Sequence, residues 1–115
     1  MRRDARALLW DVNSAAASIS EFLEGMTAES YAASPLVHSA VERKFEIIGE
    51  ALAALVQLDP ELAKRIPDVR QIIAFRNLLI HGYATIDHSR VWRIAQTFLP
   101  ALKTAIATMI EEAEH

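Results

Sequence analysis

Residues 34–60 read SPLVHSAVERKFEIIGEALAALVQLDP, and this stretch decides the class of fold. Its apolar residues are spaced four, three, four and three positions apart, which places them along one face of an α-helix. These residues are Val41, Phe45, Ile48, Leu52 and Leu55. Ser34 is a suitable N-cap, and Pro35 fits the first helical position because a proline lacks the N–H that is unpaired there. The stretch therefore predicts a long amphipathic helix.

The same apolar spacing recurs on both sides of this helix. A first helix is predicted from about Asp4, as its N-cap, to Gly25, and residues 27–33 are expected to form one short helical turn. Three helices should follow residue 58, and their predicted N-caps are Asp59, Asp68 and Asp87. Pro67 should end the first of these helices, and Gly82 should end the second.

Pro100 lies inside the apolar stripe of the last helix, which runs through Val91, Ala95, Phe98, Leu102, Ala105 and Met109. A proline there removes one backbone hydrogen bond, so a kink is predicted in an otherwise continuous helix. Four main helices joined by short connections predict an all-α protein, an antiparallel four-helix bundle with one or two short extra helices. Residues 1–115 should form a single domain.

The composition excludes several classes of protein. Hydrophobic residues make up 52% of the 115 residues and charged residues 23%, which excludes a disordered chain. The absence of cysteine excludes disulfides, thiolate zinc sites and cysteine catalysis. No apolar run approaches the roughly 20 residues of a membrane helix, and no signal peptide is apparent. We expect a soluble, cytoplasmic protein with no membrane partner.

The charge is unevenly distributed. The formal net charge is −3, which argues against a protein that grips nucleic acid through an overall basic field. Residues 64–93, however, carry six basic residues and only two acidic ones. This segment could form a local phosphate-binding face, or its charges could be those of ordinary solvated helix faces.

The residues with the most chemical potential lie at positions 76–83, which read RNLLIHGY. Arg76 supplies a permanent cation, Asn77 a carboxamide, His81 an imidazole and Tyr83 a phenol. A cation and a general acid/base suffice to cleave RNA without a metal, because the 2′-hydroxyl of RNA is itself the nucleophile. Each residue also has a simpler explanation, such as a helix C-cap for His81 or a salt bridge for Arg76.

The spacing of Arg76 and His81 adds a constraint. Five residues along an ideal helix leave the two side chains about 140° apart, so they cannot reach one phosphate from a straight helix. Either the helix unwinds at Gly82 and lets His81 swing round, or two copies of the segment complete each other's sites across a dimer axis. We expect both to occur together.

The pattern Arg76, four residues, His81, one residue, Tyr83 resembles the signature of HepT-like toxin ribonucleases of the HEPN superfamily. Asn77 occupies the polar position that commonly follows the arginine. Residues 42–51, ERKFEIIGEA, are similar to the family's second-helix segment, and residues 86–92 resemble the beginning of its last helix. The resemblance covers about residues 4–110.

This resemblance implies a helical homodimer that cleaves tRNA or mRNA without a metal or other cofactor, as the toxin of a type II toxin–antitoxin system. Arg76 and His81 of both subunits would line a cleft at the dimer interface as the catalytic residues. The implied partner is a minimal nucleotidyltransferase antitoxin, which would transfer AMP from ATP to Tyr83. The phosphate added there would compete with the substrate phosphate for the cleft.

Two further groups of residues are candidates for a functional role, the glutamates of the second main helix and the remaining histidines. Glu46 or Glu50 could orient Arg76 from the second main helix, beside Gly49, which permits a close helix approach; alternatively, both belong to a solvent-facing acidic stripe with Glu42. The remaining histidines, His38, His88 and His115, lack metal-ligand spacing, so no metal site is predicted. The competing function is a non-catalytic helical dimer module that binds a nucleotidyltransferase or a nucleotide.

Overall fold

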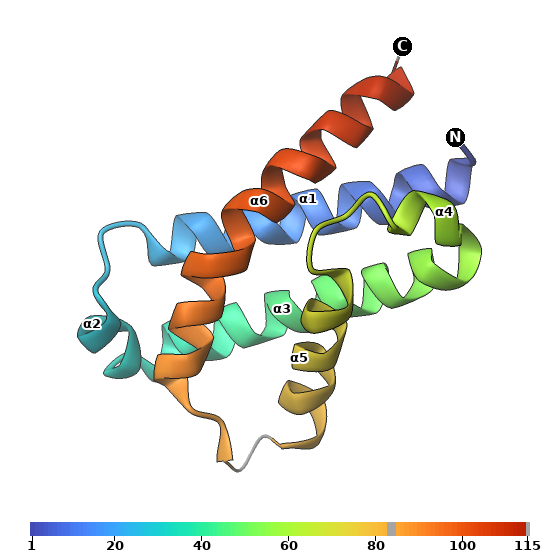
Figure 1. Ribbon diagram of the computed structural model, residues 1–115. Helices are drawn as coiled ribbons and strands as arrows, with labels where there is room; N and C mark the ends of the chain where they lie inside the picture. Colours follow the sequence, from blue (N-terminus) through green and yellow to red (C-terminus); the bar gives the residue numbers. More distant parts are fainter. Residues whose placement is uncertain (83–84, 115) are drawn as a thin grey trace.

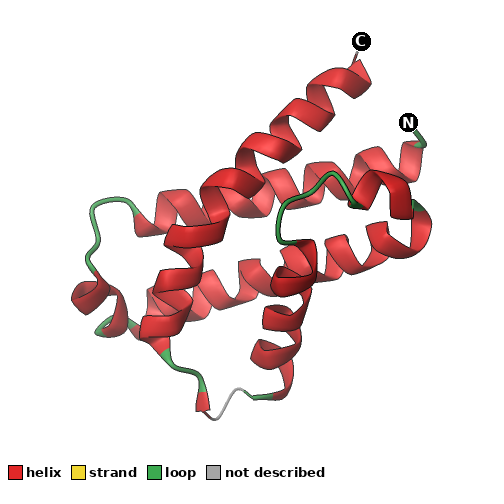
Figure 2. Ribbon diagram, in the orientation of Figure 1, coloured by secondary structure: helices red, strands yellow, loops and turns green. Residues whose placement is uncertain are grey.

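The computed structural model describes residues 1–82 and 85–114, and every long element in these ranges is an α-helix (Figures 1 and 2). The four long helices are α1 (Arg3–Leu23), α3 (Pro35–Leu58), α5 (Val69–His81) and α6 (His88–Glu114). The two short ones are α2 (Ala28–Ala32) and α4 (Pro60–Ala63). The predicted all-α fold, with four main helices and two short ones, is confirmed.

Helices α1 and α3 form the base of the bundle. They pack side by side and run in opposite directions, and the five predicted stripe residues of α3 are all buried between the helices. Helix α5 packs on α3, and α6 packs on α1. Figure 1 shows that α5 and α6 cross the α1–α3 pair steeply instead of lying along it. None of the described helices combines the length and apolarity that crossing a lipid bilayer requires.

Most of the predicted helix starts are confirmed by hydrogen bonds at the caps. Ser34 Oγ accepts from the Val37 N–H at 3.4 Å, and Asp59 Oδ1 accepts from the Leu62 N–H at 3.1 Å. Asp87 Oδ1 accepts from the Ser89 N–H at 3.0 Å and from its hydroxyl at 2.7 Å. These side chains pair N–H groups that a helix leaves open in its first turn.

Two predicted boundaries were wrong, and one predicted N-cap lacks its side-chain hydrogen bond. Arg2, not Asp4, precedes α1, and Asp4 lies in the first turn, where a carboxylate still complements the helix dipole. Asp68 does precede α5, but it adopts a left-handed conformation with φ of 58° and its side chain caps nothing. Helix α4 ends at Ala63, before Pro67 could terminate it.

Pro100 lies near the middle of α6, which continues through it as predicted. Figure 1 shows α6 changing direction partway along its length, as expected of a helix with a proline in its interior. The apolar stripe was correct at Val91, Ala95, Leu102 and Met109. Phe98, in contrast, is only half-buried, and its neighbour Leu99 is in the core instead.

Candidate functional site

Arg76 lies where α5 packs closely on α3. A Cβ atom at Gly49 of α3 would overlap the Arg76 Cβ and would lie only 2.6 Å from its Cγ. Only glycine therefore leaves room for the stem of the arginine at this crossing, and Gly49 permits the close helix approach that the sequence predicted.

The Arg76 guanidinium is partly buried in this crossing. Its Nε is shielded from solvent and has no hydrogen-bond partner among the described residues. No carboxylate of residues 1–82 or 85–114 forms a salt bridge with it. A guanidinium keeps its charge at all physiological pH values, and a buried donor without an acceptor is energetically costly. Arg76 is therefore a cation with capacity for an anionic ligand.

The two glutamates that sequence reasoning placed near Arg76 have other neighbours. Glu46 Oε1 lies 3.4 Å from Nη1 of Arg43, one turn away on α3. Glu50 is exposed and lines a shallow hollow with Asp11 on the α1 side of α3. Neither carboxylate hydrogen-bonds to Arg76 in the described structure, so an orienting role for either one stays a prediction.

His81 is the last residue of α5 and is exposed to solvent. Gly82 follows as the C-cap, and its N–H donates to the Leu78 carbonyl oxygen at 2.7 Å. Helix α5 remains regular through His81, so no unwinding before Gly82 turns this side chain towards Arg76. Unwinding at Gly82 therefore does not bring the two residues together within one chain. The other predicted route, a site completed across a dimer axis, stays a prediction.

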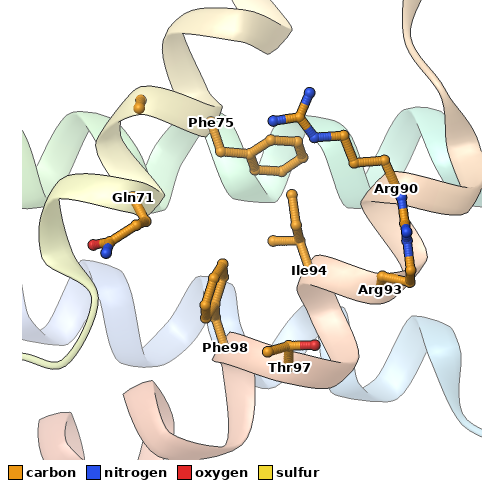
Figure 3. A pocket seen from close by; sticks show the side chains of 8 residues that line it. Gln71, Phe75, Arg90, Arg93, Ile94, Thr97 and Phe98 are labelled. Carbon is orange, nitrogen blue, oxygen red and sulfur yellow. The ribbon is translucent and has the colours of Figure 1, made fainter.

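A hollow of about 490 Å³ separates α5 from α6. Its wall carries two cations, Arg90 and Arg93, beside the aromatic rings of Phe75 and Phe98. Figure 3 shows the Arg90 side chain extending across the hollow towards Phe75. We call this the α5–α6 hollow. A surface that combines guanidinium groups with aromatic faces suits a nucleic acid strand.

His81 shares its side of α5 with this hollow. Ala74, seven positions earlier, lines the hollow, and Leu78, three positions earlier, lines an adjoining cavity of about 70 Å³. The cavity and the hollow have Phe75 and Arg90 in common. Within one chain, His81 therefore faces the α6 side of α5, whereas Arg76 faces α3.

The remaining predicted positions fall in three groups. Asn77 is exposed on α5. Tyr83 lies outside the described residues, as does His115. In the basic segment, Arg65 pairs with Glu112 at 2.6 Å and Lys64 pairs with Glu61 at 3.0 Å, so these two cations fit the ordinary alternative. Arg90 and Arg93 are the pair gathered at a concave surface.

One cluster was missed by sequence reasoning. His38 Nδ1 and His88 Nδ1 lie 3.6 and 3.5 Å from the same carboxylate oxygen, Glu42 Oε2. Spacing in the sequence did not reveal this convergence, because it is the packing of α6 that brings His88 to α3. The separation of His38 and Glu42 by four residues was the available signal, since such residues are neighbours on a helix.

Burial shifts the ionisation of this cluster. Desolvation raises the pKa of Glu42, and the nearby His88 partly opposes that rise. Desolvation also lowers the pKa of His38, and His88 lowers it further. The fully buried Tyr31 lies against both imidazoles, with ring centroids 6.1 Å from His38 and 6.4 Å from His88, and burial raises its pKa. Burial therefore favours the uncharged forms of Glu42, His38 and Tyr31.

Comparisons with known proteins point to one family. A family model described as "HepT-like: Ribonuclease HepT-like" matches residues 12–109. "Putative RNase MJ1380" of Methanocaldococcus jannaschii is 29% identical over 91% of this chain and 95% of its own length. "Probable ribonuclease HepT" of Thermococcus cleftensis is 31% identical over 90% of this chain and 93% of its own. No solved structure gives a significant match.

Proposed function

Because the chain belongs to the HepT-like family of ribonucleases, we propose that it is an endoribonuclease and the toxin of a toxin–antitoxin pair, acting in the cytoplasm on tRNA or mRNA. The observation that carries this proposal is the state of Arg76. Its stem lies over Gly49, and its shielded Nε has no hydrogen-bond partner within the described part of the chain. An exposed histidine follows five residues later. A phosphate is the ligand that this cation suits best.

The proposed reaction needs no metal ion. The His81 imidazole takes the proton of a 2′-hydroxyl, the 2′-oxygen bonds to phosphorus, and the bond from phosphorus to the 5′-oxygen breaks. Arg76 stabilises the negative charge that builds on the phosphate oxygens. A water molecule donates a proton to the departing 5′-oxygen. The products are a 2′,3′-cyclic phosphate and a 5′-hydroxyl.

The Arg76 that meets His81 at the phosphate is supplied by a second copy of the chain. Arg76 and His81 face different sides of α5 in one copy, so a homodimer is the arrangement that could bring both to one phosphate. Apolar exposure near the end of α5 supports this interface, since Leu78 is 38% exposed and Ile80 is 41% exposed. The exposed Asn77 would add a hydrogen bond to the RNA backbone from the same helix.

The α5–α6 hollow is proposed as the path of the RNA strand away from the scissile bond. Arg90 and Arg93 would contact phosphates, and the half-buried Phe98 would contact a base. The location of His81 on the same side of α5 supports this path, because the strand would run from the imidazole directly into the hollow.

Control of the toxin is proposed to act on Tyr83, through AMP transfer by a nucleotidyltransferase antitoxin. The phenol is two residues from His81 in the sequence, so an added phosphate would compete with RNA for the same cations. Coexpression with such an enzyme should add whole AMP units, measured by intact mass, and Tyr83→Phe should remain unmodified. Modification of Tyr83→Phe would refute this assignment.

The proposed function is tested by cleavage of RNA in excess EDTA. The native protein should cut, and Arg76→Ala and His81→Ala should each lose at least about a hundredfold in rate, which is the usual scale for a general base or a charge-stabilising group. RNA with a 2′-deoxy sugar at the scissile position should resist. Tight binding of a nucleotidyltransferase without any RNA cleavage would instead support the non-catalytic binding module.

A further inference from the structure

Three polar side chains from two distant parts of the sequence converge beside α2. His38 and Glu42 come from the first two turns of α3, and His88 is the first residue of α6. One donor atom from each, taken together, lie within 4.8 Å of one another. This cluster is not used by the proposed ribonuclease chemistry.

The separations do not fit hydrogen bonds. Glu42 Oε2 lies 3.6 Å from His38 Nδ1 and 3.5 Å from His88 Nδ1, whereas N–H···O bonds span about 2.7 to 3.2 Å. They do fit a shared metal ion. Ligands about 2.0 to 2.2 Å from a tetrahedral zinc ion lie about 3.3 to 3.6 Å from each other.

Two of these atoms are also buried and unpaired. Glu42 Oε2 and His88 Nδ1 are shielded from solvent and hydrogen-bond to none of the described residues. The side chains of His38 and Glu42 are only 14% and 16% exposed. Buried polar groups are nearly always paired, so an oxygen and a nitrogen that face each other across 3.5 Å call for a ligand between them.

We propose that His38, Glu42 and His88 bind one divalent ion of the zinc class, which ties the start of α6 to α3. Two imidazole nitrogens and one carboxylate oxygen suit zinc, whereas magnesium prefers an all-oxygen octahedral site. The imidazole rings lie nearly parallel, with centroids 3.7 Å apart. Each ring turns about its terminal torsion, which is broad for histidine, to direct its lone pair at the ion. A water completes the tetrahedron.

The site is structural and is separate from the reaction. The ion would cross-link two helices at the point where α6 begins, immediately after the segment that leads from His81. Because none of its ligands belongs to the Arg76 and His81 pair, removing the ion should lower stability and leave the chemistry of cleavage in place.

The test uses untagged, chelator-treated protein and zinc ions alone. Titration calorimetry should show one ion per chain, and saturation at about a hundredfold over the dissociation constant should raise Tm by about 10 °C. Glu42→Gln and His88→Ala should weaken binding by about a hundredfold or more, because each removes a direct ligand. The matched controls Glu50→Gln and His81→Ala remove an exposed carboxylate and an exposed imidazole and should bind normally.

Cobalt substitution keeps the test decisive if a variant folds poorly. Cobalt bound to the native protein should give the visible absorption of a tetrahedral ion with nitrogen ligands. Three results would overturn the proposal: no zinc binding by the native protein, which would leave a bridging water as the explanation; full binding by folded His88→Ala; or an octahedral cobalt spectrum.

Discussion

The contact between Gly49 and Arg76 is the point at which a single residue controls the candidate site. Gly49 contributes no side chain and so lets the arginine stem lie directly on α3, while the guanidinium keeps an unpaired nitrogen. A side chain at position 49 would therefore displace the arginine.

Gly49→Ala is expected to destabilise the protein by about 1–3 kcal/mol, because the new methyl group overlaps the Arg76 stem in a packed crossing. It should also reduce RNA cleavage by moving the guanidinium. Chemical denaturation and initial rates measure the two effects. Glu50→Ala, at the adjacent exposed position, is the control and should change stability by less than about 0.5 kcal/mol. An unchanged Gly49→Ala would contradict the close approach.

Asp87 gives a pH dependence of stability. Hydrogen bonds from Ser89, chiefly from its hydroxyl, lower the pKa of the Asp87 carboxyl in the folded protein. A lowered pKa contributes stability that is present above the unfolded value near 3.8 and is lost as the pH falls through the folded value. The difference in Tm between native protein and Asp87→Ala should therefore be largest near pH 7 and shrink below about pH 4. A constant difference from pH 7 to pH 3 would rule out the charged cap.

At the level of single residues, the sequence predicts only those features that depend on neighbouring residues. The types and order of residues 76–83 suffice for phosphodiester chemistry, and they can be read without knowledge of packing. The burial of Arg76 Nε was not predictable, because it depends on how α5 crosses α3. The His38, Glu42 and His88 cluster was missed for the same reason, since only the packing of α6 brings His88 to α3.

At the scale of elements, the α5–α6 hollow should determine how tightly RNA binds. Arg90→Ala and Arg93→Ala remove one phosphate contact each, so each should weaken binding and lower the salt dependence by about 0.7 in the slope of log K against log salt. Fluorescence anisotropy across a salt series measures both quantities. Arg65→Ala removes a cation already paired with Glu112 and should leave RNA affinity unchanged. Equal losses in all three variants would indicate only a general charge effect.

The helices themselves were largely predictable from their caps and breakers. Ser34, Asp59 and Asp87 accept backbone hydrogen bonds where the sequence placed them, because capping depends only on neighbouring residues. Asp4 and Asp68 were the exceptions, because Asp4 lies in the first turn of α1 and the left-handed Asp68 makes no side-chain cap hydrogen bond. The steep angle at which α5 and α6 cross the α1–α3 pair was not predictable, because it results from the packing of side chains that are distant in sequence.

For the molecule as a whole, the proposed catalytic site requires two chains. If Arg76 of one copy serves His81 of the other, a mixture of Arg76→Ala and His81→Ala proteins refolded together should regain cleavage. Random pairing makes half of the dimers mixed, each with one intact site of two, so about a quarter of native activity is expected. Each variant refolded alone is the control. No recovery in a mixture shown to exchange subunits would exclude a shared site.

The dimer could be inferred from sequence only as a geometric need, because a helix keeps Arg76 and His81 about 140° apart. The structure of one chain strengthens that need by placing the two residues on different sides of α5. How the second copy approaches depends on surfaces that one chain leaves exposed. Leu78 and Ile80, just before His81 in the sequence, belong to such a surface.

Metal-free cleavage by attack of the 2′-hydroxyl is tested most directly by the chemistry of the cut RNA ends. RNA cleaved by the native protein in excess EDTA should carry a 2′,3′-cyclic phosphate on one fragment and a 5′-hydroxyl on the other, measured by mass spectrometry. Fragments ending in a 3′-hydroxyl and a 5′-phosphate, or cleavage that stops when metal is removed, would contradict metal-free attack by the 2′-hydroxyl.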